Sequence, residues 1–325
     1  MEMDEAMEMT EDLVEVGQAF ADLGWWGVLI AVLGGAIRVS TPYLFVSLGE
    51  TITEKGGRLN LGLEGTLVLG AVAAFAISYM TGNPWLGVAA AGVAGAILGV
   101  VHALICNLPR VNDIAVGIAL FIFGTGAAFF IGKPYIQLSA PQVPSVPLGF
   151  WSDIPAIQSA LNINVLFIIG VICVPLIHWG MNSTRWGLML RTVGDSEQAA
   201  RAVGYQIRLV RTLGTAAGGF LSGMGGAFLS LYYPGTWNES LSSGQGLMAV
   251  ALVIFARWNP WYCFYASLLF GGATALGPAL QSVGITDNYY LYNAAPYVLT
   301  LALLIYSSST KHKLAGAPGE LSISR

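Results

Sequence analysis

The chain has 325 residues, of which 55% are hydrophobic and 10% are charged, and its formal net charge is −4. Because a soluble domain usually carries about 25% charged residues, this composition excludes an ordinary soluble enzyme. Several apolar runs are long enough to cross a bilayer as helices, so we expect an all-α polytopic membrane protein. The three cysteines and three histidines are scattered along the chain, which argues against a metal site.

Residues 1–26 form an acidic amphipathic segment. It contains eight Asp or Glu residues and no Lys or Arg. A signal peptide needs cations before its apolar core, so this segment does not fit one. Apolar residues recur at helical spacing and lead to Trp25 and Trp26, which predicts a short helix lying on the membrane surface.

Hydropathy predicts about nine transmembrane helices (roughly eight to ten) in a domain over residues 27–310. Their expected limits are 27–53, 61–80, 85–107, 113–132, 163–181, 212–232, 244–257, 260–282 and 288–307. The first contains Arg38, the seventh is short, and a tail over residues 311–325 follows the domain.

The cations predict the orientation of these helices, because short cytoplasmic loops are enriched in Lys and Arg. One set of alternating connections, with the C-terminus, contains Lys55, Arg58, Arg110, Arg185, Arg191, Arg201, Arg208, Arg211, Arg257, Lys311, Lys313 and Arg325. The other set contains Lys133 alone. We therefore expect an external N-terminus, with the 182–211 connection and the C-terminus in the cytoplasm. The proline-rich 133–161 connection is then external, as a docking surface, a cap over the pore or a plain covalent link.

Four arginines lie in "LRTVGDSEQAARAVGYQIRLVR", residues 190–211. Asp195 and Gln198 fit a capping box, Arg201 falls near the last turn, and Gly204 suits the left-handed position after a helix. The pattern predicts one helix of about eight residues, too short to be stable unless something covers it. An arginine cluster can also be a topological anchor alone. We interpret the segment as a coupling helix that a cytoplasmic partner receives, with the candidate residues Gly194, Asp195, Glu197, Ala199, Ala200, Arg201 and Gly204.

Three stretches resemble one family. "GLMLRTVGDSEQAARAVGYQIRLVRTLGTAAGGFLSGMGGAFLS" looks like the cytoplasmic loop and following span of permease subunits of bacterial ABC importers, in the branched-chain amino acid and simple-sugar superfamily. "TITEKGGRLNLGLEGTLVLGA" and "SGQGLMAVALVIFARWNP" resemble signatures of its nucleoside and simple-sugar branch. The similarity extends over residues 38–307. Ala256, where the family usually has glycine, and the acidic N-terminal segment depart from the pattern.

The resemblance implies a non-catalytic permease subunit in the bacterial inner membrane. Two permease subunits, usually two different chains, would form the path, and an external substrate-binding lipoprotein would deliver a nucleoside or purine-like solute. A separate ABC ATPase would bind ATP-Mg and hydrolyse it, because this chain has no GxxxxGK[ST] motif. The chain itself would need no cofactor. Membrane lipid is an expected partner, and nucleic acid is not.

Polar groups inside a span are candidates for the substrate path, because they are expensive in a membrane. "NLGLEG" opens the second span with Asn60 and Glu64, and "SSGQGLMA" opens the seventh with Gln245. In an inverted repeat, such broken helices would surround the path. If the two breaks meet, these three residues with Trp237 and Asn238 would line it. Each could instead cap a helix or satisfy a polar group of a neighbouring helix.

Three alternative functions are open at this point. The same machine could carry ribose or another simple sugar. An ion-coupled secondary carrier would need buried acids, for which Glu50, Glu64 and Asp113 qualify, but it leaves the predicted cytoplasmic helix without a role. A membrane-embedded hydrolase lacks a base near any nucleophile.

Overall fold

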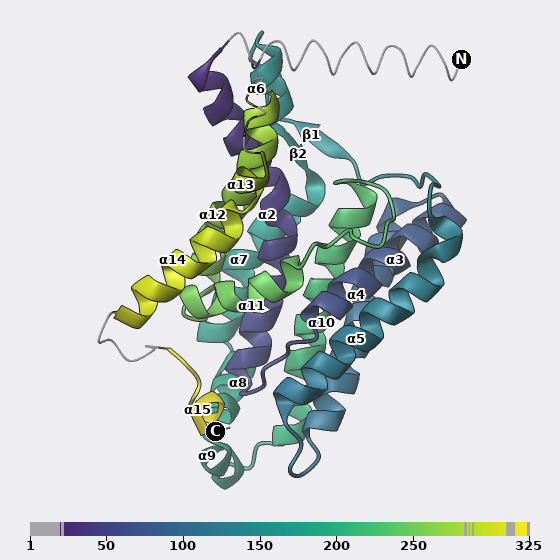
Figure 1. Ribbon diagram of the computed structural model, residues 1–325. Helices are drawn as coiled ribbons and strands as arrows, with labels where there is room; N and C mark the ends of the chain where they lie inside the picture. Colours follow the sequence, from purple (N-terminus) through teal and green to yellow (C-terminus); the bar gives the residue numbers. More distant parts are fainter. Residues whose placement is uncertain are drawn as a thin grey trace. The chain divides into compact units, whose positions relative to one another are not determined.

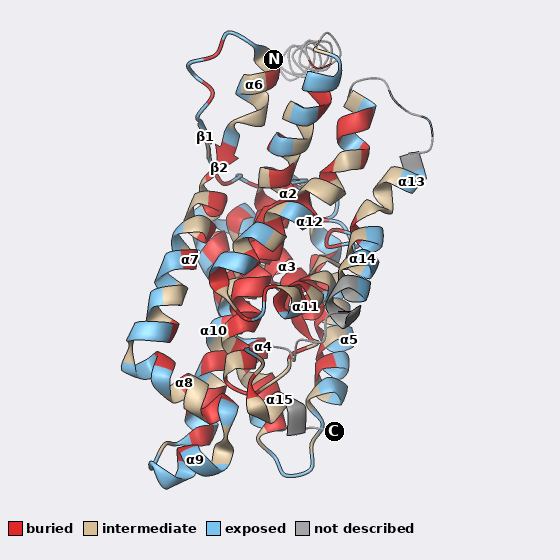
Figure 2. Cartoon of the chain, turned by 90° about the vertical axis from the view of Figure 1, so that its left-hand side faces the viewer, coloured by how far each residue is buried: buried red, intermediate tan, exposed pale blue. Residues whose placement is uncertain are grey.

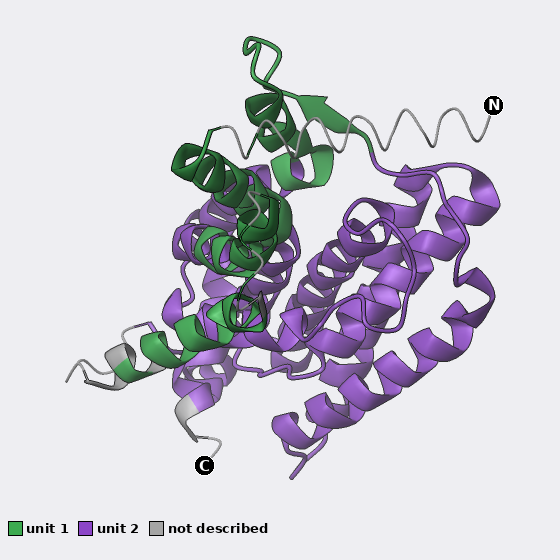
Figure 3. Cartoon of the chain, turned by 45° about the horizontal axis from the view of Figure 1, so that its top comes forward, with its two compact units in different colours: residues 1–40, 144–168, 268–308 green, residues 41–143, 169–267, 309–325 purple. Residues whose placement is uncertain are grey.

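The structure is a computed structural model, in which residues 20, 23–282, 285, 287, 289–309 and 316–323 are described. The surface helix expected in the first residues falls largely outside this described part. The chain divides into two compact units, which Figure 3 shows in different colours. Unit 1 comprises residues 1–40, 144–168 and 268–308, and unit 2 comprises residues 41–143, 169–267 and 309–325.

Unit 2 is a helical bundle. It contains α3 (Leu63–Thr81), α4 (Pro84–Cys106), α5 (Asp113–Gly132), the 3-10 helix η1 (Lys133–Tyr135), α8 (Arg185–Asp195), α9 (Glu197–Ala202), α10 (Ile207–Leu231), α11 (Gln245–Phe255) and α15 (Gly319–Ile323). The later parts of α2 (Trp25–Lys55) and α7 (Val165–Ser183) and the start of α12 (Pro260–Ser282) also belong to it. α3 packs against α4, α5 and α10, and these helices lie side by side in Figure 1.

Glycines let α4 and α10 approach each other closely. A Cβ added at Gly95 would lie 2.1 Å from the carbonyl oxygen of Gly219, and one at Gly223 would lie 2.1 Å from that of Ala91. A side chain does not fit at these distances, so each helix presents a stripe of small residues to the other. This is the usual way in which membrane helices reach close van der Waals contact without a hydrophobic driving force.

Unit 1 contains the only sheet in the part of the chain that the structure describes. β1 (Ser145–Pro147) pairs antiparallel with β2 (Asn162–Asn164), with Val146 opposite Ile163. α6 (Pro155–Ala160) separates the two strands in sequence, and α13 (Tyr289–Asn293) and α14 (Ala295–Ser309) follow later. The strand pair gives the proline-rich connection a folded local structure in place of a plain extended link.

These helices confirm an all-α polytopic membrane protein. Among the described residues, six helices are long and apolar enough to cross a membrane, namely α2, α3, α4, α5 continued into η1, α7 and α12. Three expected spans differ from the prediction. α10 begins at Ile207 rather than at 212, α11 has only 11 residues, and the last span is divided between α13 and α14. The total of nine spans stays a prediction.

The burial of the helices of unit 2 also fits a membrane environment. α3 is buried along most of its length, as the colours of Figure 2 show. By contrast, α5 exposes large apolar side chains, among them Ile122 and Phe123. Large apolar surface of this kind is typical of a protein that contacts lipid or another membrane subunit.

Candidate functional site

Glu64 joins the two interrupted helices. Its carboxylate accepts hydrogen bonds from the backbone N–H groups of Gly244 (3.0 Å) and Gly246 (2.7 Å) and from the hydroxyl of Ser242. Gly244, with a φ of 81°, directly precedes α11. The first N–H groups of a helix lack internal partners, and the helix dipole favours an anion there. Glu64, in the first turn of α3, therefore holds the N-terminus of α11.

Glycines allow the backbones to meet at this junction. A Cβ at Gly246 would lie 2.7 Å from the backbone nitrogen of Glu64, and one at Gly65 would lie 2.7 Å from the carbonyl oxygen of Leu120 on α5. The glycines of the "NLGLEG" and "SSGQGLMA" stretches thus permit close approach of three helices.

Asn60 shapes the connection between α2 and α3. It is buried, and its side-chain oxygen accepts a hydrogen bond from the N–H of Gly62 (2.9 Å). Its own N–H donates to Glu50 Oε1 on α2 (2.8 Å). These contacts are those of a turn-forming asparagine, which is the structural alternative considered for this residue.

Two buried acids of α2 lie one helical turn apart. Glu50 holds Asn60, and Glu54 accepts a hydrogen bond from the indole N–H of Trp258, which follows α11. A buried carboxyl group needs such donors because water cannot reach it. Glu50 therefore ties α2 to the α2–α3 connection, and Glu54 ties it to the residues that follow α11. Of these two acids, the sequence analysis considers only Glu50.

The remaining path candidates have different surroundings. Trp237 is buried against the end of α5, where a Cβ at Gly132 would lie 2.2 Å from its indole nitrogen. Asn238 is exposed and accepts a hydrogen bond from the N–H of Ser240 (3.0 Å) in a local turn. Gln245 begins α11, and its Oε1 is buried without a hydrogen-bond partner in the described part of the chain. The structure thus places Glu64 and Gln245 at one junction, whereas Trp237 and Asn238 contact other segments.

The predicted coupling segment folds as two helices rather than one. α8 is capped by Thr184, and α9 follows it after Ser196 alone. The expected capping box is wrong, because Asp195 is the last residue of α8. Ser196 supplies the cap instead, and its hydroxyl accepts a hydrogen bond from the N–H of Ala199 (3.2 Å). As a result, α9 has six residues rather than about eight.

The end of α9 agrees with the sequence prediction. Gly204 has a φ of 86°. Its N–H donates to the carbonyl of Arg201, and the N–H of Tyr205 donates to that of Ala200, both at 3.0 Å. This pair of hydrogen bonds is the Schellman motif, in which glycine adopts the left-handed conformation at low cost.

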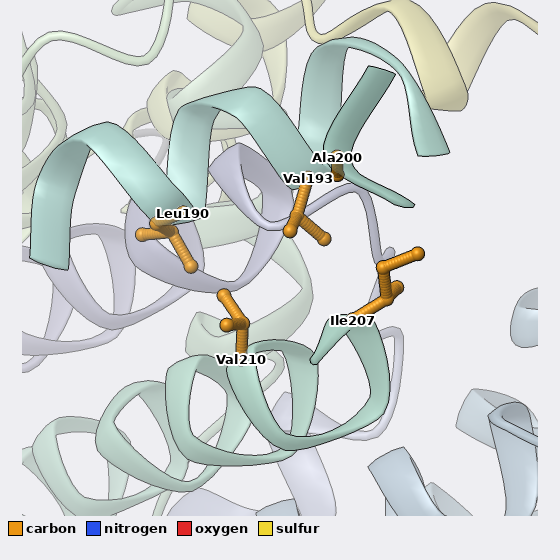
Figure 4. Packing of buried hydrophobic residues seen from close by; sticks show 5 residues of the cluster. All are labelled: Leu190, Val193, Ala200, Ile207 and Val210. Atoms are coloured by element: carbon orange, nitrogen blue, oxygen red, sulfur yellow. The ribbon is translucent and has the colours of Figure 1, made fainter. Parts of the chain in front are cut away.

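A small apolar cluster fixes α8 and α9 to the start of α10. Leu190, Val193, Ala200, Ile207 and Val210 are buried together, and Figure 4 shows their side chains converging between the helices. The spacing of Leu190 and Val193 is that of one helical face. The cluster therefore covers one side of α9 from within the chain itself.

The coupling candidates divide by burial into a buried group and an exposed group, with the half-buried Glu197 between them. Gly194 and Ala200 are buried, and a Cβ at Gly194 would lie 2.1 Å from the carbonyl oxygen of Lys55 at the end of α2. By contrast, the exposed group consists of Asp195, Ala199, Arg201 and Gly204, together with Val203, which is 64% exposed. The first group holds the segment in place, and the second is available to another molecule.

Arg211 belongs to the fold of this segment rather than to its surface. Its side chain is 6% exposed, its Nε donates to the carbonyl of Gly56 (3.3 Å), and its guanidinium pairs with Glu197 (3.1 Å). Glu197 also pairs with the exposed Arg201. Partial burial raises the pKa of the Glu197 carboxyl, but hydrogen bonds and charges from Arg201 and Arg211 outweigh it and hold that pKa below its ordinary value.

A cavity of about 700 Å³ lies beside this segment within unit 2. It is lined by the end of α2, the α2–α3 and α4–α5 connections, α9, α10, the end of α11 and residues 317–321. Arg58, Arg110 and Arg211 all line it, and Arg58 pairs with Asp113 at 2.9 Å. Asp113, an acid that the carrier alternative would need, is therefore already engaged by a cation.

Sequence reasoning missed α8, Trp258 and Glu320. A signal for α8 was present, because Trp186, Leu190 and Val193 recur at helical spacing. Trp258 was noticed only as part of a family signature. Glu320 lies in a polar C-terminal stretch, where no periodicity distinguishes it, and its contacts are with residues more than one hundred positions away.

Residues 20–308 match the sequence profile of the family described as branched-chain amino acid transport system / permease component. The chain belongs to this permease family. The match covers most of the chain, and it includes the Glu64 junction, α8 and α9. The resemblance seen in the three sequence stretches is thereby confirmed.

The relatives of this permease include proteins named as nucleoside or sugar ABC transporter permeases. A protein of Haloferax volcanii, provisionally named a glucose ABC transporter permease, is 30% identical, with 85% of this chain and 91% of the relative covered. The nucleoside ABC transporter permease NupC of Lactococcus lactis is 28% identical, with 84% and 90% covered. The guanosine ABC transporter permease NupQ of Bacillus subtilis is also 28% identical, with 85% and 92% covered. A second guanosine permease of that organism, NupP, is 22% identical, with 79% and 73% covered.

This permease is therefore a non-catalytic, multi-pass membrane subunit that works within an ABC transporter. The family assembles with an ATPase and other subunits. Among the described residues, no group of three His, Cys, Asp or Glu side chains is placed to hold a metal ion.

Proposed function

We propose that this permease forms part of the translocation path of an ATP-driven importer and that α9 transmits the movement of the ATPase to the membrane helices. The observation that carries this proposal is the division of the α8–α9 segment into a buried and an exposed face. Ala200 is fixed by the apolar cluster, whereas Ala199 and Val203 are exposed. The exposed side of α9 and the residue after its end present Ala199 and Val203 beside the charged Arg201. A helix that is attached on one side and exposes apolar residues on the other is suited to being received by a partner.

The attachment also explains how a force on α9 would reach the path. Arg211 links Glu197 at the start of α9 to Gly56, which follows α2. The same connection continues through Asn60 to Glu64, which holds the N-terminus of α11. A displacement of α9 would therefore act on both interrupted helices through the hydrogen bond of Arg211 to Gly56, the backbone of residues 56–64 and the hydrogen bonds of Glu64 to the start of α11. In this proposal Glu64, Asn60 and Gln245 adjoin the path. Trp237 and Asn238 lie toward the external end of the path.

The orientation is part of the proposal: an external N-terminus and a cytoplasmic C-terminus in the plasma membrane. The arginines of the α2–α3 connection, the α4–α5 connection and α10 line one cavity, which supports their lying on one side of the membrane. The ATPase, with its bound ATP-Mg, would occupy that side. A cysteine introduced at Val203 should react with a membrane-impermeant maleimide only in inside-out vesicles.

A substitution at Val203 tests the coupling role. In the complete transporter, Val203→Glu should abolish solute-stimulated ATP hydrolysis, because it introduces a charge into the face that the ATPase would cover. Val203→Ala, which keeps the surface apolar, and Asp153→Lys, an exposed position in unit 1, are the controls and should behave as wild type. Binding of solute by the external protein should be unchanged. Normal stimulation in Val203→Glu would contradict the proposal.

We further propose a nucleoside or purine-like solute as the cargo, with ribose or another simple sugar as the alternative. Nucleosides are favoured by the "NLGLEG" and "WNP" stretches and by the three relatives NupC, NupQ and NupP, whereas the Haloferax volcanii relative favours a sugar. A binding panel of guanosine, adenosine, uridine, ribose and glucose with the external lipoprotein separates them. Binding of a sugar without binding of any nucleoside would refute the first choice.

The second permease subunit is proposed to be a different chain. Two guanosine permeases of Bacillus subtilis match this chain, and it covers 92% of one and 73% of the other. This chain thus corresponds in length to the shorter protein of the two. Purification of the tagged permease with its ATPase should yield a second, distinct permease in equal amount, and recovery of two identical copies would refute a heteromeric path.

A further inference from the structure

Residues 316–323, near the C-terminus, make polar contacts with the segment that carries α9. The Nζ of Lys55 donates a hydrogen bond to the carbonyl of Gly316 (2.7 Å). Glu320 Oε1 accepts a hydrogen bond from the backbone N–H of Glu197 (2.8 Å). Glu320 Oε2 lies 3.7 Å from a guanidinium nitrogen of Arg211. The described part of the C-terminal stretch is therefore attached to the fold of unit 2.

Gly319 brings this stretch into backbone contact with α8. A Cβ at Gly319 would lie 2.3 Å from the carbonyl oxygen of Asp195, the last residue of α8. Glu320 also lies over the α2–α3 connection, where a Cβ at Gly57 would be 3.1 Å from the Cβ of Glu320. The carboxylate of Glu320 thus contacts the beginning of α9 and Arg211 near the start of α10, and its side-chain stem lies over the connection that leads to Glu64.

The position of α9 depends on contacts of this kind. Its six residues are too few to form a stable helix without outside support. Glu197 and Glu320 both engage Arg211, whose side chain is only 6% exposed, while that of Glu320 is 20% exposed. Charge-assisted hydrogen bonds at such partly buried positions are the strong ones, and they also fix geometry.

We propose that Glu320 is a positioning residue for α9, so that residues 316–323 hold the helix in the orientation that couples ATP hydrolysis to transport. This inference rests on the proposed coupling role of α9. Without the carboxylate, α9 keeps its apolar attachment through Ala200 but loses its polar attachment to Glu320. ATP hydrolysis should then continue while its dependence on solute weakens.

The test uses the complete transporter in proteoliposomes, with its ATPase and external binding protein. ATP hydrolysis is measured without solute and with the binding protein loaded with the solute that binds in the panel above. Glu320→Ala should lower the ratio of stimulated to basal hydrolysis by roughly tenfold, the effect of one charge-assisted hydrogen bond. Glu320→Gln keeps an acceptor for the N–H of Glu197 but loses the charge facing Arg211. Its ratio of stimulated to basal hydrolysis should therefore lie between those of wild type and Glu320→Ala.

Glu239→Ala is the matched control, because Glu239 is an exposed acid in the α10–α11 connection. Its ratio should equal that of wild type. A residue that only stabilised the fold would change the amount of assembled complex and would leave the ratio intact. An unchanged ratio in Glu320→Ala, or in Glu320→Gln if the alanine variant fails to assemble, overturns the proposal. Val203→Glu distinguishes the two proposals when the ratio is unchanged in the Glu320 variant. If Val203→Glu still abolishes stimulation, only the role of Glu320 is refuted. If Val203→Glu leaves stimulation intact, the coupling role of α9 is refuted as well.

Discussion

Replacing Glu64 with glutamine tests whether a single carboxylate holds the two interrupted helices together. The carboxylate accepts two backbone N–H groups and one hydroxyl, at the N-terminus of α11. Glutamine has nearly the same size, but it carries one acceptor oxygen and presents an NH₂ donor to N–H groups that are themselves donors. At least one donor of α11 therefore loses its acceptor.

The magnitude follows from these three hydrogen bonds. A hydrogen bond to a charged group contributes about 1.5–3 kcal/mol, and a buried donor left unpaired costs about 1–3 kcal/mol. Because neighbouring contributions are not additive, we expect a loss of about 3–5 kcal/mol for Glu64→Gln, similar to breaking a buried ion pair. Ser242→Ala removes only the hydroxyl and should cost about 1.5 kcal/mol.

The assay combines the thermal midpoint of the purified complex with solute uptake in proteoliposomes. Both variants should assemble with the ATPase, because Glu64 lies away from the exposed face of α9. Uptake should fall by more than roughly tenfold in Glu64→Gln, since each 1.4 kcal/mol of displaced equilibrium corresponds to a factor of ten. If Glu64→Gln melts and transports as wild type does, the carboxylate is not what holds α11, and the junction has to be explained by glycine packing alone.

Three further outcomes are expected. Gly223→Ala should destabilise the α4–α10 interface by about 1–3 kcal/mol through overpacking. Gly126→Ala is the control, because a Cβ there meets nothing within 4 Å, and its thermal midpoint should equal that of wild type. Equal thermal midpoints for the two variants would contradict the packing argument. Glu54→Gln should keep an acceptor for Trp258, while Glu54→Leu should destabilise the fold by about 1–3 kcal/mol and so lower the thermal midpoint. A lower midpoint for Glu54→Gln than for Glu54→Leu would refute this hydrogen bond. Because the pKa of Glu197 is lowered by folding, its contribution is present above its ordinary pKa of about 4.3 and is lost as pH falls through the folded value. The difference in midpoint between wild type and Glu197→Gln should therefore shrink on acidification, and a constant difference would show that the charge of Glu197 is not involved.

The helical order of this chain could be predicted from composition because long apolar runs leave few alternatives in a membrane. The expected limits of the second to fifth spans agree with α3, α4, α5 and α7 to within a few residues. The sequence predicts too late a start for α10, because Arg208 and Arg211 make its first residues resemble a loop. The sequence predicts α11 as a short seventh span. The glycine and serine residues before it indicate the break that the structure has there.

The site was predicted less completely, for physical reasons. Sequence patterns show where a helix ends, so the sequence predicts Arg201 in the last turn of α9 and Gly204 just beyond its end, as the structure has them. They do not show that Ser196 competes with Asp195 for the same cap, since both residue types accept that hydrogen bond. The contacts of Glu64 with Gly246 and of Glu320 with Glu197 join residues that are 182 and 123 positions apart. Only the packing of the chain brings such groups together.

The shortness of α11 has an electrical consequence. Eleven residues form a helix of about 16 Å, roughly half of a hydrocarbon core of about 30 Å. If the path passes beside α11, the membrane voltage would fall over a short distance next to Glu64. The electrical work of a crossing depends on the charge of the solute and not on this distance: a neutral nucleoside or sugar requires none, whereas a singly charged metabolite would require or gain about 2.3 kcal/mol at 100 mV. Uptake of an uncharged cargo should therefore be insensitive to the membrane potential, leaving ATP as the sole source of driving force.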